Sequence, residues 1–392
     1  MTAHVEGDGP IGVAALQSAL GDAFGGDIVV HGVTRISGGA CQDNARVDLS
    51  AQGGGLDGIT RLALRADALR SLPGSLPRRV EARVMTAAVE RGVCTPAVRL
   101  QLDDQPRVGA STLLLDWAPG VALGRRVVAG PELEQARRHL PEALAEQLAR
   151  IHSVRPEHVP GLFDDDWHGG KALGAADQRA ASAALVAGDA VPHEVEAYGL
   201  TTAAPSTFFD RDPVYAALQA VQRQLGAFVE PHPALHIIVA WLERHAPRRS
   251  DVVLVHGDFR VGNFIVSPER GLEAVLDWEF AHFGAPEEDL AWIAVRDWRF
   301  GRLDRPVGGL CERARWCRAY EAAAGRRLDP EALHWWEVLG NARWAAGAVQ
   351  QAERVLTGRE DDLEFVAIGR RAAEMEWEAL RLCRRGPPPI DA

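Results

Sequence analysis

Three side chains that can hold a metal ion and a hydroxyl group follow one another closely in the second half of the chain. The stretch VLVHGDFRVGNFIV, residues 253–266, contains Asp258 and Asn263, and VLDWE, residues 275–279, adds Asp277. Each lies at the end of a hydrophobic run that predicts a buried strand, so we expect the three to converge. Two carboxylates and an amide can bind a divalent metal and orient a hydroxyl nucleophile, which is the requirement of phosphoryl transfer.

The spacing resembles the catalytic loop of protein kinases. There the motif H-R-D-x-x-x-x-N supplies the Asp that accepts the substrate proton and the Asn that binds metal, and a later D-F-G supplies the main metal ligand. Here His256-Gly257-Asp258 keeps the same separation from Asn263, and Asp277-Trp278-Glu279 stands where D-F-G would be. These motifs resemble the aminoglycoside phosphotransferase (APH) family of small-molecule kinases, in particular the branch related to the kinase-like domain of acyl-CoA dehydrogenase fusion proteins.

The resemblance implies a role for each residue. Asp258 would orient and deprotonate the acceptor hydroxyl, whereas Asn263 and Asp277 would hold Mg²⁺. Arg260 occupies the position of the basic residue in many kinase catalytic loops, where it would neutralise charge on the transferring group. A single Asp or Asn residue after a strand is often a turn former or a helix cap. The catalytic interpretation therefore depends on the occurrence of all three residues together.

Two neighbours of these residues have expected structural roles. His256 is expected to orient the loop through hydrogen bonds, and Asp289, in EEDLAWI, to hold the loop or cap a helix. Only twelve residues separate Asp277 from Asp289, which leaves no room for a long protein-kinase activation segment. A protein substrate is therefore disfavoured.

The first third of the chain reads as a small mixed lobe. A helix is expected over residues 11–24, and strand-like runs follow at 28–36, 45–49 and 59–65. Between the first two strands, Gly38 and Gly39 would let the backbone approach phosphates closely. An ordinary hairpin turn is the alternative, although the resembling family carries a nucleotide-binding glycine loop here. That family often has Ser at the position of Cys41.

A cation and a carboxylate in this lobe match another part of the kinase pattern. Kinases hold the nucleotide phosphates with a cation on the third strand, locked by a Glu from the next helix. Arg65 ends an apolar strand, and Glu81 lies in a helical run over residues 78–91. Arg replaces the usual Lys, as in the resembling branch, and a guanidinium can bridge phosphate and carboxylate. A solvated surface pair is the alternative.

The resemblance divides the chain into two lobes. The strand STLLLDW, residues 111–117, leads into a segment that resembles the kinase hinge, where the backbone of Asp116, Trp117 and Ala118 would read the adenine edge. We expect an α+β, bilobal protein-kinase-like fold, with a small antiparallel-sheet lobe over residues 1–118 and a larger, mainly helical catalytic and acceptor-binding lobe over 119–392. Residues 164–212, rich in Ala, Gly and charge, are a lid or a surface insertion.

Helices dominate the expected second lobe. The apolar pattern predicts them over residues 144–152, 235–246, 310–324, 330–356 and 362–384. Asp329 followed by Pro330 predicts a capped helix start.

The whole-chain composition fits a globular enzyme. The chain has 392 residues, of which 47% are hydrophobic and 25% charged. Lys plus Arg number 43 against 54 Asp plus Glu, a net charge of −11, which disfavours a nucleic-acid binder. No apolar run is long enough for a membrane span, and the first residues lack a signal-peptide pattern. Five cysteines without a CxxC pair indicate reduced thiols in a cytoplasmic protein.

The combined reading is an ATP-dependent phosphotransferase that moves the γ-phosphoryl group to a hydroxyl of a small molecule, with Mg²⁺ as cofactor and with GTP left open. A hydroxyacyl-CoA is the leading acceptor, and an aminoglycoside or other antibiotic is the alternative. A protein of another class, a pseudokinase that binds nucleotide without turnover, is a further alternative. A pseudokinase would be expected to lack Asp258, Asn263 or Asp277, and all three residues are present. The oligomeric state stays open.

The two acceptors need opposite charges. The phosphates of a CoA thioester need cations, and the candidates nearest the catalytic region are Arg296, Arg299, Arg302 and Arg305. A polycationic antibiotic needs carboxylates, for which the candidates are Glu279, Glu287 and Glu288. Trp298 is a further candidate to face the acceptor.

Overall fold

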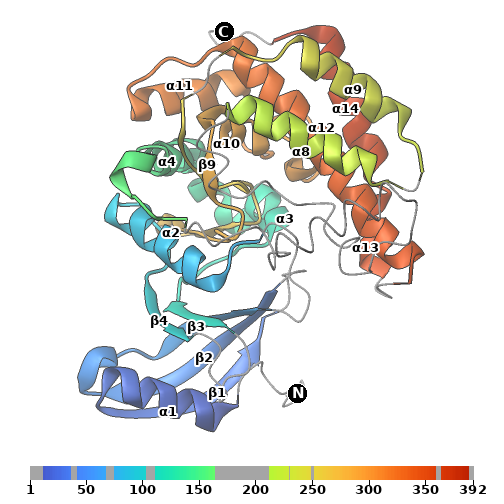
Figure 1. Ribbon diagram of the computed structural model, residues 1–392. Coiled ribbons are helices and arrows are strands. Elements are labelled where there is room, and N and C mark those ends of the chain that lie inside the picture. The colour runs from blue at the N-terminus through green and yellow to red at the C-terminus, as the bar shows by residue number, and fades with distance from the viewer. Residues whose placement is uncertain are drawn as a thin grey trace.

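A five-stranded sheet from the first part of the chain stands beside a larger, mainly helical part (Figure 1). The computed structural model describes residues 12–36, 42–67, 75–102, 111–163, 212–228, 230–248, 251–358 and 363–387. The expected mixed α+β class is confirmed. Gly38, Gly39 and Cys41, and nearly all of the candidate lid over 164–212, lie outside the described residues.

The sheet is antiparallel throughout and has the order β1-β2-β3-β5-β4. Its strands are β1 (Asp27–Arg35), β2 (Gln42–Gln52), β3 (Arg61–Asp67), β4 (Val98–Leu102) and β5 (Thr112–Asp116). The short turn η1 (Gly54–Leu56) follows β2. Helix α1 (Val13–Phe24) packs through Leu16 and Leu20 onto one face, in an apolar cluster that includes Leu62 and Leu64 of β3.

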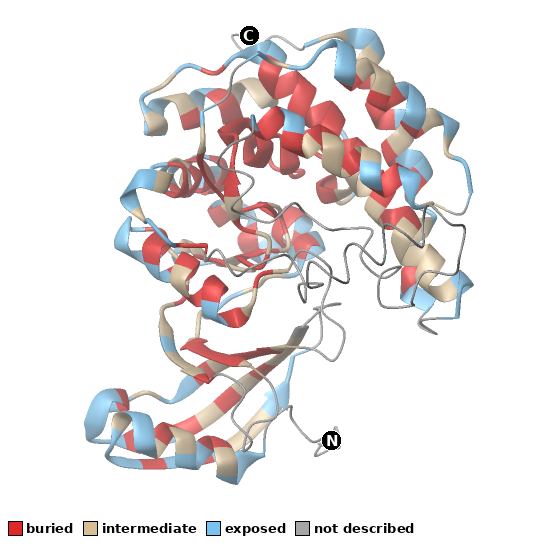
Figure 2. Cartoon of the chain, viewed as in Figure 1, coloured by how far each residue is buried: buried red, intermediate tan, exposed pale blue. Residues whose placement is uncertain are grey.

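Strand β5 is buried on both faces. Leu114 belongs to the cluster under α1, whereas Leu113 and Leu115 belong to the larger core together with Val80 and Val84 of α2 (Arg78–Glu90). Successive side chains of a strand point to opposite faces, so a strand covered on both sides reads as the uninterrupted apolar run that the sequence shows. Figure 2 shows this burial along the central strands and on α2.

The helical part surrounds the rest of the large core. Its helices are α3 (Gly124–Ala129), α4 (Glu134–Ile151), α8 (Pro213–Gly226), α9 (Pro233–Arg244), α10 (Pro286–Trp292), α11 (Arg313–Ala324), α12 (Pro330–Leu356), α13 (Leu363–Gly369) and α14 (Ala372–Arg385). Short 3-10 turns are η2 (Pro131–Leu133), η3 (Pro156–His158) and η4 (Arg296–Arg299). None of the helices described is long and apolar enough to cross a membrane.

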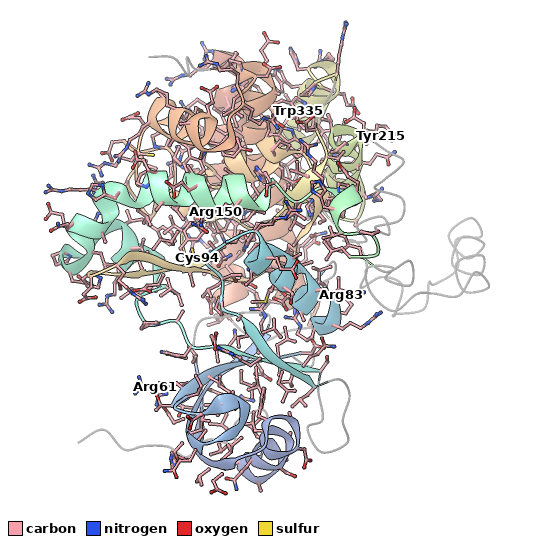
Figure 3. The ribbon with its side chains drawn as sticks, turned by 90° about the vertical axis from the view of Figure 1, so that its left-hand side faces the viewer. Arg61, Arg83, Cys94, Arg150, Tyr215 and Trp335 are labelled. Carbon is pink, nitrogen blue, oxygen red and sulfur yellow. The ribbon has the colours of Figure 1, made fainter. Side chains whose placement is uncertain are left out.

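Helix α12 is the longest of the helices that the structure describes. Asp329 caps it as predicted, because its carboxylate accepts a hydrogen bond of 2.9 Å from the backbone N–H of Glu331. Trp335 of this helix, labelled in Figure 3, is buried and donates its indole N–H to the carbonyl of Leu242 in α9 at 2.9 Å. The indole therefore joins α12 to α9.

The expectation of one helix over 362–384 is wrong, because two helices, α13 and α14, cover this segment. Both contact α12. A side chain at Gly369, the last residue of α13, would collide with Ala352 of α12, so glycine permits a close approach of these two helices. The chain then turns at residues 370–371 before α14 packs along α12.

Two short antiparallel ladders inside the helical part carry the candidate residues. They are β6 (Val253–Val255) with β9 (His282–Gly284), and β7 (Phe264–Ser267) with β8 (Gly271–Val275). Asp258 follows β6 and Asp277 follows β8, as expected, but Asn263 precedes β7 instead of ending a strand. The hairpin still brings Asn263 to Asp277, because Phe264 pairs with Val275 and the carbonyl of Asn263 accepts a 2.8 Å hydrogen bond from the N–H of Leu276.

The four cysteines in the described part of the chain are free thiols. They are Cys94, Cys311, Cys317 and Cys383. Burial raises the pKa of Cys311 and of Cys317 to about 12, so both stay protonated at neutral pH.

Candidate active site

Asp258 is buried and accepts hydrogen bonds from three side chains. The amide nitrogen of Asn263 donates to Oδ2 at 2.7 Å, and the indole N–H of Trp292 donates to Oδ1 at 2.7 Å. Nε of Arg260 lies 3.0 Å from Oδ1 and 3.1 Å from Oδ2. The predicted residues Asp258, Arg260 and Asn263 therefore meet, and Trp292 joins them from α10.

Asp289 holds the loop that presents Asp258. Its carboxylate accepts from the backbone N–H of His256 at 2.6 Å and of Gly257 at 3.0 Å. Gly257 has φ +78°, and any side chain there would collide with the carbonyl of Phe280. Nε2 of His256 donates to the carbonyl of Leu276 at 3.0 Å, and burial lowers the pKa of His256, which keeps the ring neutral. The expected structural roles of His256 and Asp289 are confirmed.

His152 supports Asp289 in turn, a role that the sequence did not reveal. Its Nε2 lies 3.3 Å from Oδ2 of Asp289, and its Nδ1 lies 2.7 Å from the hydroxyl of Tyr320. Burial alone would raise the pKa of Asp289, but the hydrogen bonds that it accepts from His152 and from the backbone of His256 lower it. No local sequence pattern predicts this contact, because His152 and Asp289 are 137 positions apart.

Arg65 lies in a cluster of carboxylates where β3, α2 and the segment after β8 meet. Its Nε is 3.1 Å from Glu81 Oε1, and its Nη2 is 2.5 Å from Asp277 Oδ1 and 3.7 Å from Glu279 Oε1. Burial opposes the charge on Arg65, but the three carboxylates outweigh it and raise its pKa. Burial likewise opposes the charge on Asp277, and Arg65 outweighs it and lowers the pKa of Asp277. The predicted Arg65–Glu81 pair forms, with Glu279 as an additional partner.

Arg78 is a second buried cation in the same cluster. Its guanidinium pairs with Glu81 and with Asp67, the latter at 2.9 Å, and donates to the carbonyl of Leu76 at 3.1 Å. Glu81 is thus shared between Arg65 and Arg78. The helical i,i+3 spacing of Arg78 and Glu81 was the sequence signal that could have found this pair.

Asn263 and Asp277 fit a divalent metal by their chemistry. The amide nitrogen of Asn263 is engaged by Asp258, which leaves its oxygen, the atom that a hard cation takes, on the other side of the amide. Mg²⁺ usually takes one or two carboxylates together with substrate phosphates and water. Across the ranges that the structure describes, no group of three or more His, Cys, Asp or Glu side chains could hold a metal ion.

The candidate hinge residues lie where the sheet gives way to the helical part. The carboxylate of Asp116 is bound by Arg99 at 2.6 and 3.0 Å, and the N–H of Asp116 donates to the carbonyl of Ala97 at 3.0 Å. Trp117 and Ala118 follow β5 directly. A little further on, Val121 pairs with Val266 of β7, which ties this segment to the strand that follows Asn263.

Two of the expected cations for a CoA acceptor are committed to other partners. Arg299 is 3% exposed and pairs with Glu378 at 3.0 Å and Glu337 at 3.6 Å, so the expectation that it faces the acceptor is wrong. Burial lowers the pKa of Arg299 against the pull of these carboxylates. Arg296 stacks over Trp377 and pairs with carboxylates of α14. The side chains of Arg302 and Arg305 are 39% and 42% exposed, and both pair with Asp304 at the surface.

The expected carboxylates for a polycationic acceptor are also engaged within the protein, and that expectation is wrong. Glu279 accepts from Ser75 and lies within the arginine cluster. Glu287 pairs with Arg326 at 3.1 Å, and Glu288 pairs with Arg343 at 2.7 Å and His282 at 3.2 Å. All three carboxylates are buried.

Parts of the chain are similar to acyl-CoA dehydrogenase family members. It is 29% identical over 226 residues to acyl-CoA dehydrogenase family member 10 of Mus musculus, which is 57% of this chain and 17% of that protein. It is 38% identical over 89 residues to family member 11 of Gallus gallus, which is 21% of this chain and 12% of that protein. The chain spans less than a fifth of the length of these relatives.

Solved structures show the expected protein-kinase-like fold. The crystal structure of "a putative aminoglycoside phosphotransferase" from Ralstonia eutropha JMP134 has a TM-score of 0.66 and 19% identity, and covers 96% of this chain and 99% of that one. The ethanolamine kinase of Plasmodium vivax has a TM-score of 0.50 and 11% identity, with coverages of 91% and 83%. At these identities the likeness establishes the fold.

The match of the sequence to a family model establishes the family. The family model described as "Phosphotransferase enzyme family" (APH) matches residues 32–326, which is most of the chain and includes every candidate residue described above from Arg65 to Asp289. The resemblance inferred from the H-G-D and D-W-E motifs is confirmed. The chain belongs to the APH phosphotransferase family, whose members transfer phosphoryl groups to small molecules.

Proposed function

We propose that this protein is an ATP-dependent kinase that transfers the γ-phosphoryl group to a hydroxyl of a small molecule. One observation carries the proposal: Asp258 and Asn263 share a hydrogen bond, and the hairpin places Asp277 beside them against the buried Arg65. Phosphoryl transfer depends on positioning and on electrostatic stabilisation. This cluster supplies a proton acceptor, two oxygen ligands and a cation for both.

The residues divide the work by their chemistry. Asp258 accepts the proton of the acceptor hydroxyl, and Arg260 stabilises the negative charge of the group in transfer. Arg65 grips the nucleotide phosphates while Glu81 keeps its guanidinium in place. Asn263 and Asp277 would hold Mg²⁺, which would supply positive charge to offset the negative charge of the phosphates.

The nucleotide lies between two lobes in this proposal, residues 1–118 and 119–392. The backbone of Asp116, Trp117 and Ala118 reads the base, and Gly38 and Gly39, which lie outside the described residues, are the glycines proposed to bind the phosphates. ATP is the proposed nucleotide, with GTP as the competing one. The free thiols of the described part accord with a reducing, cytoplasmic setting.

A hydroxyacyl-CoA is the proposed acceptor. The support is the likeness to proteins named as acyl-CoA dehydrogenase family members, of which this chain matches a part. Arg302 and Arg305, whose side chains are 39% and 42% exposed, are the cations beyond the catalytic region that are proposed to bind the phosphates of CoA. An aminoglycoside or other antibiotic is the competing acceptor.

A coupled ADP-release screen tests the proposal. The wild type and Asp258→Asn are assayed with Mg·ATP and with hydroxyacyl-CoAs, aminoglycosides, amino alcohols and sugars. General-base help is typically worth about 10² to 10⁴ in rate, so the variant is expected to lose turnover by about that factor while calorimetry shows unchanged Mg·ATP affinity. Nucleotide binding by the wild type without turnover of any acceptor would favour a pseudokinase instead.

A further inference from the structure

Asp258 has a buried hydrogen-bond partner that belongs neither to its own loop nor to the β7–β8 hairpin. We propose that Trp292 is a positioning residue, whose indole N–H fixes the carboxylate of Asp258 in the orientation that the reaction needs. This inference rests on the proposed function. Trp292 is the last residue of α10, 34 positions from Asp258, and its Nε1 donates to Oδ1 at 2.7 Å.

The three donors to Asp258 differ in how firmly they are held. A carboxylate has about four acceptor positions; Trp292 takes one on Oδ1, Asn263 takes one on Oδ2, and Nε of Arg260 is shared between the two oxygens. The side chain of Arg260 is 24% exposed, whereas Trp292 is 6% exposed. Arg260 is therefore the partner that an acceptor hydroxyl can replace, while Trp292 and Asn263 keep the carboxylate in place.

The ring of Trp292 is fixed by contacts from α12. The guanidinium of Arg343 lies 5.1 Å from the ring centroid and is itself bound by Glu288 at 2.7 Å. The ring of Trp344 meets the Trp292 ring edge-on at 6.5 Å. Cation–π and edge-to-face contacts of this kind favour one orientation of the ring. The indole N–H is thus aimed at Asp258 by α12.

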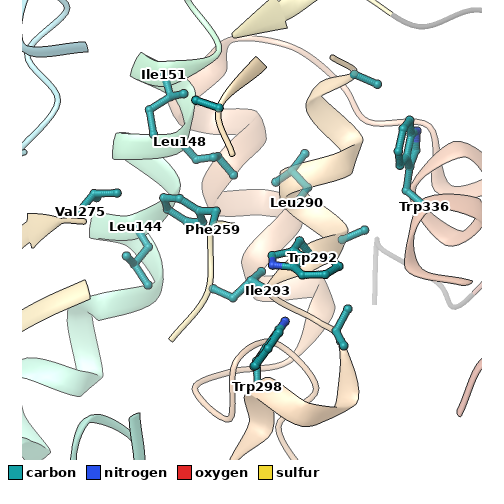
Figure 4. Packing of buried hydrophobic residues seen from close by; sticks show 14 of the residues in the cluster. Leu144, Leu148, Ile151, Phe259, Val275, Leu290, Trp292, Ile293, Trp298 and Trp336 are labelled. Atoms are coloured by element: carbon teal, nitrogen blue, oxygen red, sulfur yellow. The ribbon is translucent and has the colours of Figure 1, made fainter. Parts of the chain in front are cut away.

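Arg260 rests on the same tryptophan cluster, formed by Trp292, Trp298 and Trp344. Its guanidinium lies 4.4 Å from the ring centroid of Trp298, whose ring is 5.9 Å from Trp292 and 4.7 Å from Trp344. Figure 4 shows Trp292 and Trp298 in the buried core near Ile293. Trp298 contributes its ring only, because its indole nitrogen has no hydrogen-bond partner among the described residues. One cluster therefore supports both donors to Oδ1.

The orientation of Asp258 is a property on which the reaction rate depends strongly. A catalytic group must lie within a few tenths of an ångström of its reacting geometry, and loss of that alignment lowers the rate without weakening ground-state binding. The carboxylate of an Asp can rotate about its Cα–Cβ and Cβ–Cγ bonds if a hydrogen-bond donor is lost. Loss of the Trp292 hydrogen bond is therefore expected to act on kcat and not on KM.

Trp292→Phe is the direct test, because it keeps most of the ring and removes the donor. The hydrogen bond to a charged group predicts a fall in kcat of about tenfold to a hundredfold, with the KM for ATP and for the acceptor within about twofold. In the Asp258→Asn background the same change is expected to have less than a twofold effect, because the two residues then act as one unit. Trp335→Phe is the matched control: it removes a buried indole hydrogen bond of 2.9 Å on α12 that leads to α9, and is expected to leave kcat within twofold.

A second measurement follows the contact without catalysis. In the ¹⁵N spectrum of indole-labelled protein, the Trp292 signal is assigned by its loss in Trp292→Phe, and it is expected to move in Asp258→Asn while the Trp335 signal stays. Wild-type kcat in Trp292→Phe, with Asp258→Asn inactive, would overturn the positioning role and leave the proposed function standing. A wild type without any phosphotransfer would refute the proposed function, and an unmoved Trp292 signal would refute the contact itself.

Discussion

Nη2 of Arg65 lies 2.5 Å from Oδ1 of Asp277, and this contact joins β3 to the end of the β7–β8 hairpin across 212 positions of the chain. Asp277 is one of two non-glycine residues in the described ranges with a positive φ, at +71°. Such a backbone costs about 1 to 3 kcal/mol and persists where the surroundings enforce it, often at functional sites. The strained turn directs the carboxylate of Asp277 toward Arg65.

The proposed link between Arg65 and Glu81 predicts a strong coupling. Arg65→Ala and Glu81→Ala are each expected to raise the KM for ATP about tenfold or more, as loss of a charge-assisted hydrogen bond does. The double variant is expected to fall clearly short of the product, because both changes disable the same phosphate contact. Steady-state kinetics with varied ATP measure all three.

Arg138 and Glu134 provide the control pair for this cycle. Their side chains are 70% and 65% exposed and form an i,i+4 ion pair, which solvent and salt screen strongly. Their alanine variants are expected to leave the KM for ATP unchanged. If the KM for ATP of the double variant rose by the product of the two single-variant factors, Arg65 and Glu81 would act separately.

Asp277→Asn tests the proposed metal site without disturbing the turn. Asn tolerates a positive φ at least as well as Asp does, so the fold is expected to persist while the negative charge proposed to bind Mg²⁺ is lost. Calorimetry is expected to show that ATP binding no longer strengthens when Mg²⁺ is added. An undiminished Mg²⁺ dependence would remove Asp277 from the metal site.

Sequence analysis predicted the candidate residues that local spacing brings together, and it missed the contacts between residues that are distant in the sequence. Asp258, Asn263 and Asp277 were found because a loop and a hairpin place them by local spacing. Trp292 was missed because its bond to Asp258 depends on how α10 lies against the loop, which no spacing records. Arg299 was misassigned for the same reason: nearness in sequence to the catalytic region does not fix direction, and its side chain points to Glu378 in α14.

The buried carboxylate of Asp289 predicts a dependence of stability on pH. Its pKa is lowered in the folded protein, so its stabilising effect is present above the unfolded pKa of about 3.9 and is lost as pH falls toward the folded value. The difference in unfolding free energy between the wild type and Asp289→Asn is therefore expected to be large at pH 7 and to shrink below about pH 4. Urea unfolding at a series of pH values measures this difference.

Asp22→Asn is the control for this series, because Asp22 is exposed on α1. Surface substitutions usually change stability by less than about 0.5 kcal/mol, so this variant is expected to follow the wild type at every pH. An Asp289→Asn difference that stayed constant from pH 7 to pH 3 would show that the charge of Asp289 does not stabilise the loop.

A change at Arg302 and Arg305, the two partly exposed arginines that follow η4, is expected to separate the acceptor classes. Replacing both with Gln removes charge without the loss of stability that changing the buried Arg299 would bring. If they bind the phosphates of a hydroxyacyl-CoA, the KM for that acceptor is expected to rise about tenfold to a hundredfold, as loss of charge-assisted hydrogen bonds does. An aminoglycoside, being cationic, is expected to bind equally well or slightly better.

Arg327→Gln, which changes an arginine 74% exposed beyond α11, is the control and is expected to alter neither KM. We expect the CoA outcome, and phosphorylation of an aminoglycoside with none of any hydroxyacyl-CoA would reverse that choice.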